Sequence, residues 1–266
     1  MTYKSLDIAK TLILMAQEDG GRGGERLTNL KLQKLLYYAQ GYHLAAFGTS
    51  LFEDAIEAWM YGPVVPVCYE HYQKYGSKSL PMLQGQSYGR LDDIDDRLLR
   101  QVYNSLVAYS AIGLMQMTHT ESPWLDTNPK GHGTVISTTK MKDYFKPKYP
   151  TLVRAAYAKT LDSFVAKNED SEYSPSDMSI KRCLSVLDIM PDAVLPYIAL
   201  TPNEFGSINI SIRVGNERRM TINTGDETMS WYCCTDYNSR PCGQSFVGYD
   251  DATLSEIVQT AKKLVV

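Results

Sequence analysis

The closest match to a catalytic motif in this sequence is a split zinc-binding pattern. In zinc deaminases, His-x-Glu is followed later by Pro-Cys-x-x-Cys, where the His and Cys side chains bind zinc and the Glu transfers protons. Here His119-Thr-Glu121 is followed by Pro241-Cys242, but Ser245 stands where the second cysteine should be. The two halves also fall in different expected domains, so we interpret this match as coincidence.

Two other fragments imitate catalytic loops. Gly243-Gln-Ser245 begins like the nucleophile elbow of a hydrolase, but Val247 stands where that motif needs its second glycine. The run GGRGG at residues 20–24 has no Lys-Ser or Lys-Thr after it and no strand before it, so it is not a phosphate-binding loop. We expect a flexible connector there.

Cysteines and aspartates offer two candidate metal sites. Cys233, Cys234 and Cys242 lie close together in the sequence, but no histidine is near them to complete a zinc site. The aspartates within residues 92–96 could bind a cation, yet the start of a helix explains them equally well because its dipole favours negative charge. We therefore expect no metal, no cofactor and no enzymatic activity.

A further group of residues is better suited to holding a partner than to catalysis. Tyr and Trp combine apolar rings with polar tips, and together with Lys and His they can form half-buried networks. Gly62 followed by Pro63 forces a sharp, rigid corner. The group consists of Lys31, Lys34, Tyr37, Tyr38, Trp59, Tyr61, Gly62, Pro63, Val64, His119, Pro123 and Trp124. The residues alone leave two roles open: a surface that grips a partner, or a core that locks helices together.

Helices must position this group, because helical periodicity dominates the chain up to about residue 168. A first helix contains Ile8, Leu12 and Met15 and ends at Gly20. Thr28 is the expected N-cap of a second helix that continues to about residue 47. Further helices are predicted at residues 64–75, 92–117, 137–145, 150–167 and 176–190, with another turn starting at Ser122.

The pattern changes in the last part of the chain. Residues 207–214 alternate with a period of two, which indicates a strand, and Gly215-Asn216 is a turn signal. Strands are predicted at residues 207–214, 219–224 and 228–234, and a last helix at 252–265. We predict a mainly α protein. A compact multi-helix domain at residues 1–168 is followed by a smaller α+β domain at 169–266 with a three- or four-stranded antiparallel meander.

Charge narrows the class of partner. Residues 1–168 carry 19 Lys and Arg against 16 Asp and Glu, whereas residues 169–266 carry 8 against 14. Phosphate contacts need clustered Lys and Arg, so the acidic last part disfavours a nucleic-acid partner. The sequence lacks a signal-peptide pattern and any apolar run of the ~18 residues that span a bilayer. We expect a cytoplasmic protein with reduced cysteines.

Three motifs carry a resemblance to a known family. They are LTNLKLQKLLYYAQ, LFEDAIEAWMYGPVVP and THTESPW, in that order. With them, about residues 3–150 resemble the Panacea domain, the SocA-like antitoxin family of bacteria and their phages. The resemblance implies a compact helical fold with no known catalytic site, in a protein that neutralises a toxin. The positions that match the family pattern are Lys31, Lys34, Tyr38, Trp59, Tyr61, Gly62, Pro63, His119 and Trp124.

The resemblance implies that this chain is the antitoxin of a bacterial or phage toxin–antitoxin pair and binds a toxin encoded by a neighbouring gene. An alternative is a phage or mobile-element effector, or a proteolytic adaptor, that binds a host protein such as a protease. A third possibility is an enzyme that uses His119 and the tyrosines as a small-molecule site. Residues 195–232 resemble, less specifically, a helix-plus-meander module of other toxin–antitoxin proteins, and we expect this acidic domain to help recognise the partner.

Overall fold

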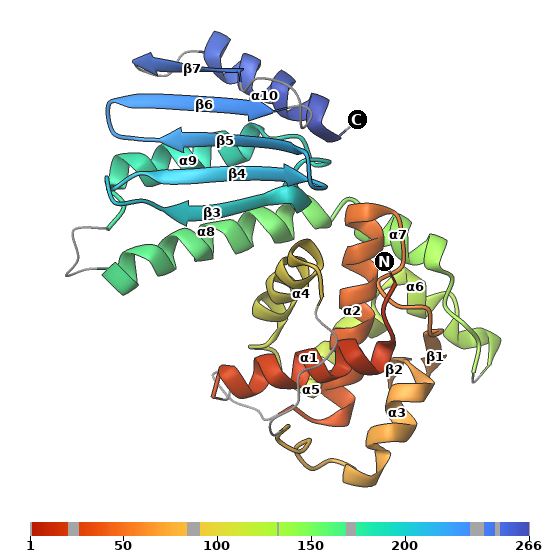
Figure 1. Ribbon diagram of the computed structural model, residues 1–266. Helices are drawn as coiled ribbons and strands as arrows, with labels where there is room; N and C mark the ends of the chain where they lie inside the picture. Colours follow the sequence, from red (N-terminus) through yellow and green to blue (C-terminus); the bar gives the residue numbers. More distant parts are fainter. Residues whose placement is uncertain are drawn as a thin grey trace. The chain divides into compact units, whose positions relative to one another are not determined.

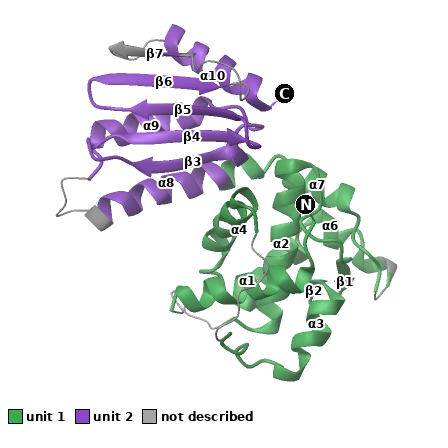
Figure 2. Ribbon diagram, in the orientation of Figure 1, with its two compact units in different colours: residues 1–152 green, residues 153–266 purple. Residues whose placement is uncertain are grey.

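The computed structural model of the chain describes residues 2–20, 27–83, 91–131, 133–168, 174–234, 242–247 and 251–265. Most of the GGRGG segment, and Pro241, lie outside these ranges. The chain forms two compact units, residues 1–152 and 153–266 (Figures 1 and 2). The sequence places the boundary later, at residue 168. The difference arises because α8 (Tyr149–Asn168) packs mostly with the second unit, where the Tyr157 hydroxyl donates to the Leu195 carbonyl at 2.6 Å.

The helix α2 (Asn29–Phe47) lies at the centre of the first unit and is buried along most of its length. It begins as predicted, because the Thr28 hydroxyl accepts a hydrogen bond from the Lys31 amide at 3.3 Å. Gly41 is required within it, since a Cβ at this position would collide with the Phe145 ring of the neighbouring helix α7 (Thr138–Phe145). This glycine therefore lets two helices approach closely.

The other helices of the first unit surround α2. They are α1 (Ser5–Glu18), α3 (Pro66–Tyr72), α4 (Asp93–Leu106), α5 (Ala111–His119), α6 (Ser122–Leu125) and α7 (Thr138–Phe145), with short 3-10 turns η1 (Gln73–Tyr75) and η2 (Asn128–Lys130). The prediction of one long helix over residues 92–117 is wrong. Two helices form instead, because the Ser110 hydroxyl accepts a hydrogen bond from the Gly113 amide at 3.0 Å and so starts α5 anew.

The aspartate run at residues 92–96 has a structural explanation. Asp92 is the N-cap of α4, and its carboxylate accepts hydrogen bonds from the amides of Ile94 and Asp95 at 3.1 and 2.9 Å. The run therefore starts the helix, as the dipole argument predicts, and this part of the structure needs no cation to account for it.

A short hairpin interrupts the helical unit. It consists of β1 (Glu57–Trp59) and β2 (Gly62–Val64) (Figure 1), and the strand register places Trp59 opposite Gly62. A segment at residues 134–136 runs beside β1, where the Ala58 amide donates to the Thr134 carbonyl at 2.9 Å. The helix predicted over residues 64–75 begins only at Pro66. This proline lies in the first turn of the helix, where its missing N–H costs no hydrogen bond. Strands of three residues are too short to produce a period-two pattern, so the hairpin is not predicted from sequence.

The second unit is a meander with helices on one face. The strands β3 (Ile198–Pro202), β4 (Ile208–Val214), β5 (Arg218–Thr224), β6 (Thr228–Cys234) and β7 (Cys242–Val247) pair in sequence order, all antiparallel. The helices α9 (Asp177–Ile189) and α10 (Asp251–Val265) pack against β4 and β5, and the 3-10 turn η3 (Leu195–Tyr197) precedes β3. The predicted fold class, mainly α with a smaller antiparallel unit, is confirmed. Over the described residues of this unit the sheet has five strands rather than three or four, because β3 and β7 join the three predicted ones.

Candidate functional site

The corner at Gly62 is the best-defined feature of the candidate site. Gly62 has φ of +96°, a region that L side chains rarely adopt. A Cβ at this position would lie 2.7 Å from both the Lys34 Nζ and the Thr118 Oγ1. Only glycine therefore fits, and the corner turns the two residues between the strands, Met60 and Tyr61, outward.

Lys34 holds this corner from the interior. Its side chain is fully buried, and its Nζ donates to the Pro63 carbonyl at 2.9 Å. Burial lowers the pKa of Lys34 to about 7, so an uncharged amine is populated at neutral pH and still donates this hydrogen bond. The predicted Gly-Pro corner is thus clamped by a lysine of α2.

Glu121 organises the tyrosines of α2. The hydroxyls of Tyr37 and Tyr38 donate to its two carboxylate oxygens at 2.9 and 3.0 Å. Burial raises the pKa of Glu121, although these hydrogen bonds act in the opposite direction. Burial and the neighbouring carboxylate raise the pKa of both tyrosines, and both rings pack edge-on against Phe145. The carboxylate is therefore the hub of a buried polar network.

Trp124 ties α6 to the hairpin. Its indole Nε1 donates to the Trp59 carbonyl at 2.9 Å, and its ring stacks on the His119 ring with centroids 4.0 Å apart. Burial, with the nearby charge of Lys34, lowers the pKa of His119. The His119 Nε2 is buried without a hydrogen-bond partner among the described residues. His119 therefore serves as a packing surface for Trp124 in this structure.

Two of the predicted residues lie at the sides of this arrangement. The indole of Trp59 donates to Glu57 at 2.7 Å and its ring contacts Tyr69. Lys31 is buried, donates to the Val107 carbonyl at 2.8 Å and lines an apolar cavity of about 310 Å³ together with Leu35. Lys31 thus belongs to a different part of the unit from the hairpin corner.

The residues in and beneath the hairpin include a buried group and an exposed group. We call Lys34, Tyr37, Tyr38, Glu121 and Trp124 the frame, since all five are buried. We call Met60 and Tyr61 the tip; their exposed fractions are 69% and 63%. The structure therefore brings most of the predicted residues together beneath the hairpin, and Tyr61 is the most exposed of them.

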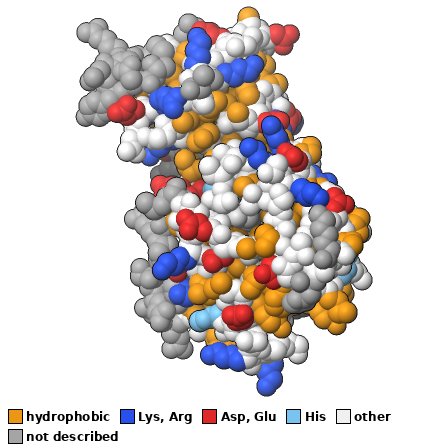
Figure 3. Space-filling model, turned by 90° about the vertical axis from the view of Figure 1, so that its right-hand side faces the viewer, with side chains coloured by type: hydrophobic (Ala, Val, Ile, Leu, Met, Phe, Trp, Pro, Cys, Tyr) orange, Lys and Arg blue, Asp and Glu red, His pale blue; other side chains and the backbone are white. Residues whose placement is uncertain are grey.

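Other exposed apolar side chains lie on segments that are hydrogen-bonded to the hairpin. Leu125 follows Trp124 in α6, and Val135 lies opposite Glu57 in the segment beside β1. In Figure 3, which faces the side of the helical unit that carries β1 and α6, hydrophobic side chains gather in the lower part of the view. Exposed apolar groups that lie together are typical of a protein-binding surface.

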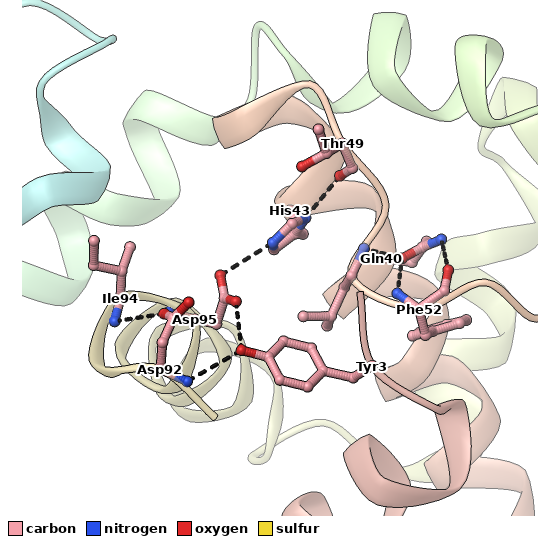
Figure 4. Close-up of polar contacts among 9 residues, drawn as sticks. Tyr3, Gln40, His43, Thr49, Phe52, Asp92, Ile94 and Asp95 are labelled. Carbon is pink, nitrogen blue, oxygen red and sulfur yellow. Dashed lines mark hydrogen bonds and ion pairs between the residues drawn. The ribbon is translucent and has the colours of Figure 1, made fainter. Parts of the chain in front are cut away.

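Sequence reasoning missed a second buried network, which joins the start of the chain to α2 and α4. His43 Nε2 lies 3.1 Å from Asp95, its Nδ1 lies 2.7 Å from the Thr49 carbonyl, and the Tyr3 hydroxyl donates to Asp95 at 2.9 Å (Figure 4). Burial raises the pKa of Asp95, but the hydrogen bonds from His43 and Tyr3 outweigh it, and the net shift is downward. A histidine among the apolar residues of α2 was the available signal.

The candidate metal ligands in the described part of the chain do not gather into one cluster. Among those residues, no cluster of three or more His, Cys, Asp or Glu could hold a metal ion. Cys233 is buried on β6, while the side chain of Cys242 is outside the described part. Over the same residues, no helix is both long and apolar enough to cross a membrane.

Comparisons with known proteins agree with the motif resemblance. Residues 32–125 match the family model described as "Antitoxin SocA-like, Panacea domain". A protein named Antitoxin SocA, from Caulobacter vibrioides (strain NA1000 / CB15N), is 35% identical over 120 residues, which are 41% of this chain and 63% of that relative. No solved structure matches.

The matched range contains the whole frame and both tip residues, and it ends at Leu125, the last residue of α6. Lys31 lies just before it, and the whole second unit lies beyond it. The resemblance read from the three motifs is therefore confirmed: residues 32–125 of this chain match the SocA-like Panacea domain model.

Proposed function

We propose that this protein is an antitoxin that neutralises a toxin by direct protein–protein binding in the cytoplasm, without catalysis. The observation that carries the proposal is the Panacea-domain match, together with the relative named as an antitoxin. The polar groups of the frame support a binding role, because their hydrogen bonds are made within the protein rather than left open to a substrate. The partner is a toxin encoded by a neighbouring gene.

The tip is the proposed contact with the toxin. Met60 and Tyr61 stand on a two-residue turn whose ends are fixed, so little conformational entropy is lost when they bind. Tyrosine is among the residues that dominate binding energy at protein interfaces, and methionine adapts to the partner surface. Leu125 and Val135 supply further exposed apolar area. In this proposal the frame positions the tip and the toxin contacts the tip.

Growth of bacteria tests the proposed function. The neighbouring gene is induced alone and together with this protein, and the two products are copurified from the same cells. The proposal predicts that the neighbouring product stops growth, that this protein restores growth, and that the two copurify as a stable complex. The negative control is the Glu121→Ala variant, in which the frame is broken.

Two results would contradict the proposal. One is a neighbouring product that does not affect growth. The other is restored growth without a complex, because direct binding would then not be the mechanism. Restored growth that also depends on a host protease would support the adaptor alternative instead, in which the protein delivers its partner for degradation.

A further inference from the structure

The sheet of the second unit has one face that no described helix covers. α9 and α10 lie behind the sheet in Figure 1, against the side that carries Ile208, Ile210 and Ile212. Because side chains alternate along a strand, the residues between these isoleucines point to the opposite face. We call that opposite face the open face.

The strand register gives the composition of the open face. Two rows run across the strands: Thr201, Asn209, Asn223 and Ser230 in one, and Ala199, Ser211, Thr221 and Tyr232 in the other. All of these side chains are uncharged. All are also small except Tyr232, whose exposed fraction is 47%. Hydrogen bonds within the rows, from Asn223 to Asn209 and from Thr221 to the Tyr232 hydroxyl, both 3.0 Å long, hold them in place. The result is a flat, polar surface with one aromatic ring.

Two arginines lie at one end of the open face. Arg213 and Arg219 are exposed and lie directly opposite each other on β4 and β5. Like charges in this position repel, and neither guanidinium has a hydrogen-bond or ion-pair partner among the described residues. No acidic residue occurs in the two rows. A carboxylate between the two arginines would remove this repulsion through charge-assisted hydrogen bonds.

We infer that the open face is a second docking surface, for a protein partner that places an acidic side chain between Arg213 and Arg219 and packs against Tyr232. A nucleic acid fits less well. Exposed acidic residues, Glu204, Glu217 and Glu227, lie in the turns at the ends of these strands and would repel a continuous phosphate backbone. The exposed ring of Tyr232 and the planar guanidinium groups are typical of protein interfaces.

Selection from a display library of short random peptides against the full-length protein tests this inference. It needs no toxin, so its outcome is independent of the antitoxin proposal. We expect the selected peptides to be enriched in Asp and Glu, and to bind the R213E/R219E and R213Q/R219Q variants at least about tenfold more weakly than the wild type. The matched control is K262E/K263E, which makes the same change of charge on exposed residues of α10 and should bind as the wild type does.

Melting temperatures show whether the variants are folded. The milder R213Q/R219Q variant keeps the test valid if charge reversal disturbs the sheet. Selected peptides without acidic enrichment would overturn the inference. So would acidic peptides that bind R213E/R219E as tightly as the wild type. Binding of single-stranded oligothymidylate that is lost in both arginine variants, with no acidic peptide selected, would assign the face to nucleic acid instead.

Discussion

The frame and the tip are adjacent in space but differ in almost every physical property. Lys34 and Tyr37 are fully buried, and each polar group of the frame is matched to a specific partner 2.9–3.0 Å away. Met60 and Tyr61 are exposed, and their backbone is held at the two ends of the turn, Trp59 and Gly62. The first region resists change, whereas the second can be changed without disturbing the fold.

Because of this difference, residues of one family motif can have two roles: some build the fold, and others can contact a partner. Lys34, Tyr38 and Trp124 lie in the motifs from which the family resemblance was predicted, yet they make their contacts inside the domain. The pattern thus marks residues that build a particular corner, and one exposed residue within it, Tyr61, is free to contact something else. Substitutions in the frame should act mainly on stability, and those in the tip mainly on binding.

The largest effect is expected from Glu121→Ala, which removes the shared acceptor of two buried tyrosine hydroxyls. Unsatisfied buried hydroxyls and the resulting cavity should lower the free energy of unfolding by about 4 kcal/mol. The concentration of denaturant at the unfolding midpoint measures this. Glu70→Ala, on an exposed position of α3, is the control and should change the stability by less than about 0.5 kcal/mol. Equal midpoints for the two variants would break the distinction between frame and surface.

Gly62→Ala should destabilise the protein by about 3 kcal/mol, since it combines an unfavourable φ with a Cβ that is too close to Lys34 and Thr118. Gly215→Ala is the matched control: its φ is +64°, but nothing lies within 4 Å of the added Cβ. This control should lose only about 1 kcal/mol, the cost of the backbone conformation. Identical losses would mean that the contacts beneath the corner do not matter.

Lys34 should make stability depend on pH. Its pKa is about 7 in the folded protein and near 10.5 when exposed, so the unfolded chain binds more protons between these values. Stability due to this residue therefore rises with pH, by about 2 kcal/mol from pH 7 to pH 9, and is flat below pH 7. Unfolding midpoints of the wild type and Lys34→Met across this range measure the difference. A parallel pH dependence in both proteins would show that Lys34 titrates normally.

The smallest effect on stability is expected when the hydroxyl of either of two tyrosines is removed. Tyr37→Phe should cost about 1 kcal/mol because a buried hydrogen bond to Glu121 is lost, whereas Tyr61→Phe should leave stability unchanged. Denaturant midpoints measured side by side test this pair. If Tyr61→Phe were the more destabilising of the two, the tip would be part of the core.

The sequence was sufficient to predict much of the helical unit. The Thr28 cap, the helix after it and the Gly62-Pro63 corner follow from local rules that the structure obeys. The same rules predicted one helix over residues 92–117, and they could not anticipate that Ser110 would start a new one. A single capping hydrogen bond, worth ~1 kcal/mol, decides between the two outcomes and leaves hardly any trace in hydrophobic periodicity.

The candidate site was predicted only in part, for a similar reason. Tyr37, Tyr38 and Lys34 were recognised as polar groups that need partners, but which group satisfies which depends on contacts between residues more than 80 positions apart, such as Tyr37 and Glu121. Met60 was missed because exposure is a property of the folded hairpin. The strands β1 and β2 were missed because three residues give no period.

The affinity of this protein for the toxin proposed as its partner, measured for the wild type and for Met60→Ala/Tyr61→Ala, tests the central claim most directly. The account predicts that the double variant melts at the same temperature but binds about a hundredfold more weakly, because exposed anchors carry binding energy and not stability. Tyr109→Ala, at another exposed tyrosine of the helical unit, should bind as the wild type does. Unchanged affinity in the double variant would contradict the account, because the toxin would then be held elsewhere on the protein.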